Sequence, residues 1–433
     1  IMASNAKNLA EYLNNQTTSA TADIADGSIT TAKLADDAVT TAKLSNDAVG
    51  ADQLADNSVV TANITSGAIS TIKVADGAIT TDKVTGVGGA GKNVIINGSM
   101  QVAQRGTSST GLGAANGYFT CDRYRHVFSG TAGRLTSSQS SDAPAGFGKS
   151  LKFDCTTADT SIAAGEYFFF SQKIEGQHLQ HFAKGTSSAK AFAVSFYVKG
   201  NAAATYALEL YDADNNRQCS KSFSVTTSWN RVELIFPADT TGAFGNDNAE
   251  SLTLSWWLHA GTTFTSGTLN SSAFAANNNA NRALSTTSFF DSTNRTFFIT
   301  GIKLEPVQVT DFEHETFEET LRRCQRYYLR AGGANYANLF GVGGIANTTG
   351  SWFGLGYIPV PMRAGFTLVQ SGGTPRIQNG QAGYNASSIS MSLQSTHGTG
   401  LSAGCNASGL TLYRWHNFDA GASAALFELD AEL

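Results

Sequence analysis

The sequence predicts a mainly β protein, in which a fibrous trimeric repeat shaft precedes an antiparallel β-sandwich and a second, C-terminal β-sandwich domain. Three observations lead to this fold class: a ten-residue repeat near the N-terminus, alternating apolar positions from Phe192 onward, and a composition with only 15% charged residues and 44 glycines. The chain has 433 residues, which is more than one domain of about 150 residues holds. Short helices are expected at the N-terminus and between the β domains.

A ten-residue repeat fills residues 24–86 and includes the copies IADGSITTAK and LADDAVTTAK. An apolar residue occupies every fifth position. These positions are Ile24, Ile29, Leu34, Val39, Leu44, Val49, Leu54, Val59, Ile64, Ile69, Val74, Ile79 and Val84. A spacing of five fits neither the helical nor the strand period, so the unit must change conformation within itself. We expect the Thr pair to begin a single helical turn and the Asp-Gly or Asp-Asp pair to end it.

One copy of the repeat cannot bury its own apolar residues. Residues 24–92 contain no Phe, Tyr, Trp or Pro, and thin aliphatic ridges cannot offset the entropy of ordering about sixty residues. We therefore predict a parallel homotrimer in which the fifth-position residues meet around a threefold axis. The alternative is a disordered low-complexity linker, which leaves the strict apolar period unexplained.

Changes in composition mark the domain boundaries. Residues 4–13 carry a helical apolar face, and we interpret residues 1–20 as an N-terminal attachment helix. Residues 21–90 are assigned to the trimeric shaft, which ends in the glycine-rich hinge GVGGAG. Residues 91–312 are assigned to the β-sandwich, and residues 313–433 to a linker helix with a C-terminal β domain at the tip.

Alternating apolar residues predict β-strands in the middle of the chain. The alternating sets are Phe192/Val194/Phe196/Val198, Tyr206/Leu208/Leu210, Val232/Leu234/Phe236, Leu252/Leu254/Trp256/Leu258 and Phe298/Thr300/Ile302/Leu304. Breaks rich in Asp, Asn and Gly separate them, which is typical of an antiparallel sandwich. Thr316 and Glu319 form a capping-box signature, which predicts a short helix between the two β domains.

Charge and composition exclude several classes of protein. The net charge is −5 and no basic block is present, so a nucleic-acid partner is not expected. No apolar run approaches the roughly 20 residues of a membrane helix, and the first residues lack the apolar stretch of a signal peptide, so neither membrane insertion nor Sec export is expected. The five cysteines are widely spread without CxxC spacing, which predicts free, buried thiols and assembly in a reducing cytoplasm.

The sequence contains partial matches to nucleotide-binding and metal-binding motifs, but the residues around them do not fit those functions. Residues 86–91 match GxGxxG, but a shaft precedes them and an extended segment follows, so no nucleotide is expected. Residues 212–216 resemble the opening of an EF-hand loop, but Arg217 and Phe223 stand where Gly and a carboxylate are required, so a hairpin turn is the better interpretation. No GxSxG elbow or carboxylate pair stands out. We therefore predict a protein that is not an enzyme and has no catalytic, cofactor-binding or metal-binding residues.

Aromatic residues of the β domains are the remaining candidates for ligand contact. Trp and Tyr rings stack on sugar rings, and neighbouring polar side chains can bond to hydroxyl groups. The candidate glycan contacts are Trp257, Trp352, Tyr357, Tyr413, Arg414 and Trp415. For each of them, a place in a core or in a trimer interface is the alternative interpretation.

Several distinctive sequence blocks follow one another along the chain. They are the start MASNAKNLAEYLN, the decapeptide repeats, NVIINGSMQVAQRGT (93–107), CDRY (121–124), SQKIEGQHLQ (171–180), VSFYVKGN (194–201), FFITGIKLEPVQVTDFEHETFEETLRRCQRYY (297–328), VPMRA (360–364) and the ending LDAEL. In this order the blocks resemble bacteriophage tail fibre proteins, especially those of marine phages. The match spans essentially the whole chain. Tyr124 departs from the Trp that follows DR in many relatives, which affects only a core contact.

The resemblance implies a virion appendage. It implies a homotrimeric tail fibre that docks to the phage tail or an adaptor protein by its N-terminus, with a jelly-roll domain similar to carbohydrate-binding modules and a C-terminal β tip for attachment to a host-surface glycan. The protein would be located in the virion tail after assembly in the host cytoplasm. Two alternatives remain: a glycan-cleaving depolymerase tailspike, for which a long parallel β-helix would be expected, and a structural fibre without a receptor.

Overall fold

The computed structural model describes residues 2–15, 27–36, 38–44, 48, 64, 93–284, 286–394 and 398–433. The chain divides into two compact units, Ile1–Val84 and Thr85–Leu433. The glycine-rich hinge at 86–91 lies outside the described residues. So do eight of the predicted axis positions, namely Ile24, Val49, Leu54, Val59, Ile69, Val74, Ile79 and Val84. Within the described residues, no helix is long and apolar enough to cross a membrane.

The first unit contains a helix and two short turns that repeat. Helix α1 spans Met2–Asn15, and the 3-10 turns η2 and η3 span Thr31–Lys33 and Thr41–Lys43. Each turn follows a threonine, and in each the lysine Nζ donates to the carbonyl five residues earlier, at 2.6 Å. Two neighbouring copies of the ten-residue unit therefore share one local geometry.

The five fifth-position apolar residues that the structure describes are all exposed in the single chain. Their exposed fractions are 53% for Ile29, 46% for Leu34, 53% for Val39, 45% for Leu44 and 41% for Ile64. Side chains of this type gain about 1.5–3 kcal/mol when they move from water into a core. The described copies thus hold a regular set of aliphatic residues whose burial is incomplete.

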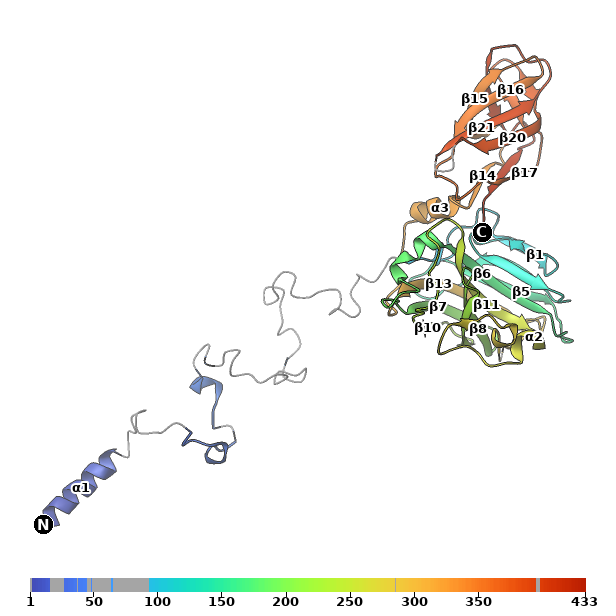
Figure 1. Cartoon of the computed structure of the whole chain (residues 1–433). Helices are drawn as coiled ribbons and strands as arrows, with labels where there is room; N and C mark the ends of the chain where they lie inside the picture. Colours follow the sequence, from blue (N-terminus) through green and yellow to red (C-terminus); the bar gives the residue numbers. More distant parts are fainter. Residues whose placement is uncertain are drawn as a thin grey trace. The chain divides into compact units, whose positions relative to one another are not determined.

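The second unit begins with a jelly-roll sandwich of two antiparallel sheets (Figure 1). The first sheet has the order β1 (Ser108–Leu112), β4 (Arg134–Ser140), β5 (Ser150–Thr157), β13 (Thr296–Pro306), β7 (Phe192–Gly200) and β10 (Asn230–Phe236). The second has the order β12 (Ala275–Ala276), β9 (Arg217–Val225), β8 (Ala204–Asp212), β11 (Glu250–Ala260), β6 (Tyr167–Glu175), β3 (Arg125–Ser129) and β2 (Gly117–Tyr118). Short helices in the connections are η8 (Gly176–His178), η9 (Gln180–Phe182), α2 (Thr262–Thr265) and η10 (Asn279–Asn281).

Aromatic residues from both sheets meet in the sandwich core. Phe196 of β7 contacts Trp256 of β11 with ring centroids 6.0 Å apart, and Phe153 of β5 contacts Phe170 of β6 at 5.3 Å. The predicted alternation in β7, β8 and β11 is confirmed, since the predicted residues of these strands belong to the core between the sheets, whereas Trp257 and Ala207 belong to a separate cluster. The hairpin at 212–216 is also confirmed, because β8 and β9 pair in register on either side of it.

The alternation predicted for β13 is wrong in its first half. Phe297 and Ile299 face the core before a β-bulge, and Ile302 and Leu304 face it afterwards. The bulge contains Gly301, whose φ of +65° suits a residue without a side chain. One extra residue shifts every following side chain to the other face.

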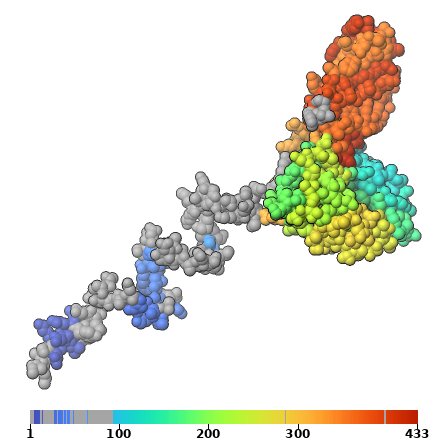
Figure 2. Space-filling view, viewed as in Figure 1, coloured from blue at the N-terminus to red at the C-terminus, as the bar shows by residue number. Residues whose placement is uncertain are grey.

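The C-terminal domain consists of a seven-stranded and a three-stranded antiparallel sheet. The larger sheet has the order β19 (Gly383–Asn385), β18 (Arg376–Gln378), β22 (Trp415–Asp419), β15 (Asn338–Ala346), β16 (Ser351–Tyr357), β21 (Gly400–Asn406) and β20 (Ser387–Leu393). The smaller sheet has the order β14 (Tyr328–Gly332), β23 (Leu426–Asp430) and β17 (Thr367–Ser371). In Figure 2 the jelly-roll surface is cyan to yellow, and the surface of the C-terminal domain is orange to red.

Helix α3 (Phe317–Gln325) connects the two β domains, as the sequence predicts. Thr316 caps it, and Thr316 and Glu319 form the expected reciprocal capping box. Cys324 on this helix packs with Ile96 and Tyr327 in a small core that is separate from those of the two sandwiches. All five cysteines are free and buried, which confirms that part of the prediction.

Charged side chains hold the two β domains together at a surface that we call the joint, made of Arg105, Arg123, Glu175, Arg326 and Glu432. Arg123 pairs with Glu432, and both side chains are nearly fully buried. Arg326 holds Glu175 with two hydrogen bonds of 2.9 and 2.7 Å. Although burial alone would raise the pKa of Glu175, the bonds from Arg326 and Tyr327 hold it below its ordinary value.

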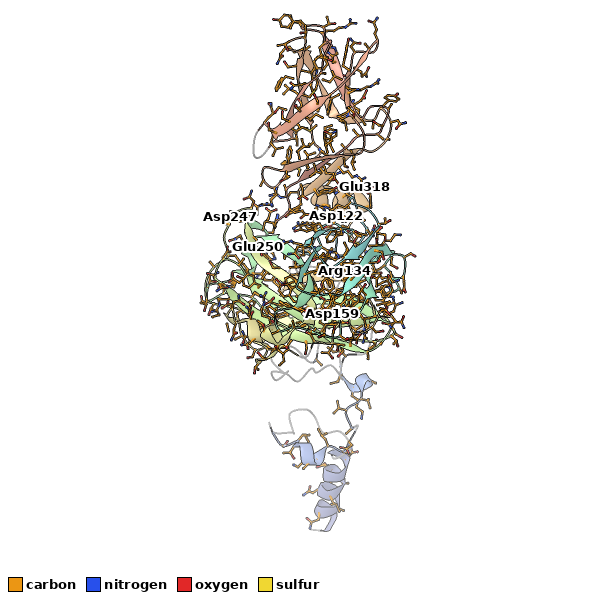
Figure 3. All side chains as sticks on the ribbon, turned by 90° about the vertical axis from the view of Figure 1, so that its right-hand side faces the viewer. Asp122, Arg134, Asp159, Asp247, Glu250 and Glu318 are labelled. Atoms are coloured by element: carbon orange, nitrogen blue, oxygen red, sulfur yellow. The ribbon has the colours of Figure 1, made fainter. Side chains whose placement is uncertain are left out.

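Six of the sequence blocks singled out above contribute residues to this joint or contact it. Blocks that supply joint residues or their contacts are 93–107, 121–124, 171–180, 297–328, 360–364 and the LDAEL ending. Arg363, for example, donates to the carbonyls of Ala431 at 2.9 Å and Asn248 at 3.0 Å. Figure 3 shows Asp122 and Glu318 in this region, where the two β domains meet. These six blocks are far apart in the sequence and come together in one three-dimensional junction.

Candidate binding surface on the C-terminal domain

The structure divides the six predicted contact residues into exposed and buried ones. Tyr357, Tyr413 and Trp415 are 75%, 74% and 61% exposed. Arg414 is exposed as well. Trp257 and Trp352 are 0% and 2% exposed, so their assignment as surface contacts is corrected here to core positions.

Trp257 lies on the outer face of its sheet, but that face is covered. It packs with Phe264 of helix α2 and with Phe169 in a small core of its own. Its Nε1 donates to Glu209 at 3.0 Å, and the Arg282 guanidinium lies 4.8 Å from the ring centroid. The short segment after β11 therefore closes over a side chain that strand alternation alone would leave in solvent.

Trp352 faces the core of the C-terminal domain because of the glycines beside it. A Cβ added to Gly354 would lie 2.4 Å from the Trp352 ring, so only glycine leaves room for the indole on the inner face. The ring also stacks on Phe418 at 5.8 Å. Phe353 and Leu355 consequently point outward, with 43% and 50% of their surface exposed.

The outer face of the larger sheet carries a set of exposed apolar side chains, which we call the platform: Trp415, Ile345, Phe353, Leu355 and Tyr357. Ile345 of β15 lies opposite Trp415 of β22 on one side and opposite Phe353 of β16 on the other. Strand pairing therefore places these three side chains in one row across adjacent strands. Only Trp415 and Tyr357 of the platform were identified from the sequence.

The Trp415 indole is fixed against the sheet. A Cβ added to Gly343 would lie 2.3 Å from Cζ2 of Trp415, so the ring lies directly on the β15 backbone. Its Nε1 donates to Oδ1 of Asn417 at 3.2 Å. One ring face is therefore supported by the strand, and the other is open to solvent.

Uncharged polar groups border the platform. Asn417 follows Trp415 on the same face of β22, and Ser402 lies opposite Leu355. Oγ of Ser402 lies 2.8 Å from Oγ of Ser392 on the next strand. Strands β15, β16, β20 and β21 contain no charged residue at all. This surface can offer ring stacking together with hydroxyl and amide hydrogen bonds.

Tyr413 and Arg414 lie beside the platform in the turn that leads into β22. Tyr413 has a φ of +61°, and its N–H donates to the carbonyl of Ala346 at 3.0 Å. Nη2 of Arg414 donates to Oε1 of Gln381 at 3.1 Å. Tyr413, Arg414 and Trp415 are thus consecutive residues at the start of β22, and the structure adds Ile345, Phe353 and Leu355 to the predicted set.

Comparison with known proteins finds similarity to solved structures but none to family models or to curated sequences. No family model matches the chain. No curated protein matches it in sequence. Among solved structures, a family 4 carbohydrate-binding module matches with 10% identity over 48% of this chain and 97% of its own, with a TM-score of 0.25.

Two further structures cover a similar share of the chain. A family 11 module from Clostridium thermocellum, solved with a mixed-linked β-1,3-1,4 tetrasaccharide, has 12% identity and covers 47% of this chain and 98% of its own, with a TM-score of 0.24. The enzymatically active domain of tailspike protein 4 of bacteriophage CBA120 has 13% identity and covers 50% of this chain and 21% of its own, with a TM-score of 0.25.

Proposed function

We propose that this chain is a homotrimeric phage tail fibre without enzymatic activity that attaches the virion to a neutral host-surface glycan through the platform. The observation that carries the glycan-binding part is the in-register row of Trp415, Ile345 and Phe353, which are exposed side chains without charge on three adjacent strands. An apolar ring supported from behind by the backbone needs no rearrangement to stack on the flat face of a sugar.

The chemistry of the platform favours a neutral ligand over other occupants. Asn417 and Ser402 at its margin supply amide and hydroxyl groups, which match the hydroxyls of a sugar. The platform and these two neighbours include no carboxylate and no imidazole, so they lack the pair of carboxyl groups that most glycoside hydrolases use. This supports binding rather than cleavage at this surface.

The fibre part of the proposal is supported by the first unit. Four consecutive fifth-position residues that are about half exposed, Ile29, Leu34, Val39 and Leu44, would be covered by two further chains around a threefold axis. Trimerisation would present three platforms per fibre. Weak binding at each of them would then gain by effective concentration, commonly by 10²–10⁴-fold.

The remaining parts of the proposal follow from the resemblance to tail fibre proteins. Helix α1 would dock to the phage tail or to an adaptor protein, and the finished protein would reside in the virion tail. The free thiols fit assembly in the reducing host cytoplasm.

The test uses the full-length chain on an array of neutral bacterial surface glycans, with a host adhesion assay in parallel. Trp415→Ala and Phe353→Ala should each lower glycan binding at least about tenfold, in line with loss of a stacking hot spot. Phe317→Ala is the matched control, because Phe317 is 47% exposed but lies on helix α3. Its glycan binding should equal that of the unchanged chain.

Four outcomes would overturn parts of this proposal. Unchanged binding in Trp415→Ala and Phe353→Ala would remove the platform as the glycan site. A change of oligomeric state in these variants, measured by light scattering, would identify the platform as an interface between copies of the chain. Released oligosaccharide in the reaction mixture would show a depolymerase, and the absence of both adhesion and cleavage would leave a structural fibre.

A further inference from the structure

A second cluster of polar side chains lies in the jelly roll, apart from the platform and the joint. Asp159, Glu166 and His259 each present one potential ligand atom, and these atoms lie within 4.8 Å of one another. His259 is 0% and Asp159 is 5% exposed. In Figure 3, Asp159 lies farther from the C-terminal domain than Asp122 does.

The three residues come from separate segments whose backbones are tied together. Asp159 follows β5, and its N–H donates to the carbonyl of Phe290 at 2.8 Å. Glu166 precedes β6, and its carbonyl accepts from the N–H of Gly261 at 2.8 Å. His259 is the last residue but one of β11. Main-chain hydrogen bonds therefore fix where each side chain starts.

The His259 ring supplies the observation that points to a ligand. Its Nδ1 lies 2.8 Å from Oγ of Ser288, which orients the ring. Its Nε2 is buried, has no hydrogen-bond partner among the described residues, and lies 3.9 Å from Oε2 of Glu166. A buried polar atom without a partner is destabilising, so such an atom calls for an occupant between it and its neighbours.

The two carboxylates are also oriented by the protein. Oδ2 of Asp159 accepts from Oγ1 of Thr131 at 2.7 Å and from the N–H of Ala132 at 2.8 Å. Oε2 of Glu166 accepts from the N–H of Ala163 at 3.0 Å. Metal-binding carboxylates and imidazoles usually make such hydrogen bonds to neighbouring groups, which hold the ligand atoms in the orientation that the metal requires.

We propose that Asp159, Glu166 and His259 bind one divalent transition-metal ion, for which Zn²⁺ is the best match. Zn²⁺ accepts an imidazole nitrogen together with carboxylate oxygens at about 2.0–2.2 Å, with a water able to fill a fourth position. Ca²⁺ prefers oxygen ligands only and so fits this set poorly. The ion would draw the ligand atoms closer together and tie the loop between β5 and β6 to the end of β11.

The test is calorimetric titration of the metal-stripped, full-length chain with ZnCl₂. One Zn²⁺ should bind per chain. His259→Gln and Glu166→Gln should each weaken binding at least about tenfold, the smallest effect expected even for an outer-shell residue. His181→Gln is the matched control, since it removes an exposed imidazole from outside the cluster. The Glu166 side chain is 13% exposed, so this variant tests the site even if His259→Gln fails to fold.

The Zn X-ray absorption spectrum provides an independent readout. It should show one imidazole nitrogen and oxygen ligands in the first shell, and His259→Gln or Glu166→Gln should abolish that signature. The proposal is overturned by the absence of saturable Zn²⁺ binding to the unchanged chain. It is also overturned by equal Zn²⁺ affinity in Glu166→Gln, or by Ca²⁺ binding to the cluster as tightly as Zn²⁺.

Discussion

The joint between the β domains contains a charge pair with both side chains buried, Arg123 and Glu432, which the substitution Glu432→Gln would break. The Arg123 and Glu432 side chains are 1% and 4% exposed. Arg123 also donates to the carbonyl of Lys173 at 2.8 Å and lies with its guanidinium carbon 3.4 Å from the Tyr327 ring centroid. Glutamine preserves the shape of the side chain and an acceptor oxygen, but it leaves the Arg123 charge buried without a counter-ion.

The expected cost follows from the burial of the pair. Loss of one partner of a buried pair costs about 3–5 kcal/mol, and we expect about 3 kcal/mol because Arg123 keeps its carbonyl and aromatic contacts. Asp430→Asn is the matched control. Asp430 also bonds an arginine, Arg105 at 3.0 Å, but its side chain is 36% exposed. Its removal should cost less than about 1 kcal/mol.

Urea unfolding of the full-length chain, followed by tryptophan fluorescence, measures both variants. The five tryptophans lie in both β domains, so the signal reports whether the domains unfold in one transition or in two. Glu432→Gln should lower the midpoint of the transition and separate the two domains, and Asp430→Asn should do neither. Equal midpoints for the two variants would show that the burial of Glu432 does not determine how much its charge stabilises the joint.

Three further predictions concern other parts of the chain. Burial lowers the pKa of His126 from 6.5 to about 3, so the stability that the neutral side chain contributes is present above pH 6.5 and is lost as the pH falls towards 3. Calorimetric scans should show that the unchanged chain loses about 3 kcal/mol more stability between pH 7 and pH 4.5 than His126→Phe does. Gly301→Ala should destabilise the jelly roll by about 1–3 kcal/mol in urea, since φ is +65° and a Cβ would meet two aromatic rings, whereas Gly148→Ala, in open space, should be neutral. Leu34→Ser should shift trimer to monomer in light scattering and Ala35→Ser should not, and a trimer that persists in Leu34→Ser would contradict the proposed axis.

The elements predicted from the sequence are those that local chemistry decides. The capping box of Thr316 and Glu319 defines the start of α3, and the turn at 212–216 defines a hairpin. Strand β13 departs from the prediction because a bulge at Gly301 changes the face of every residue after it. Nothing in the alternation Phe298, Thr300, Ile302 marks that bulge, since both faces of this strand carry apolar residues.

The platform was only partly predictable for the same physical reason. In the strand SWFGLGY both alternating sets contain large apolar residues, so alternation cannot tell which set faces the core. The glycines determine which set faces the core. Gly354 leaves room for the Trp352 ring on the inner face, and Phe353 must then point outward. Trp257 shows the opposite case, since its face was identified correctly but a later segment covers it.

The joint could not be predicted from local patterns, because 309 residues separate Arg123 from Glu432. The joint nevertheless accounts for the position of some of the charged residues, which make up only 15% of the chain. Buried ion pairs hold the two β domains in one arrangement, while the platform residues themselves are uncharged and strands β15 and β16 carry no charged residue. Salt screens exposed charges much more than buried ones. The arrangement of the β domains and the binding of a neutral glycan should therefore both persist across a wide range of ionic strength.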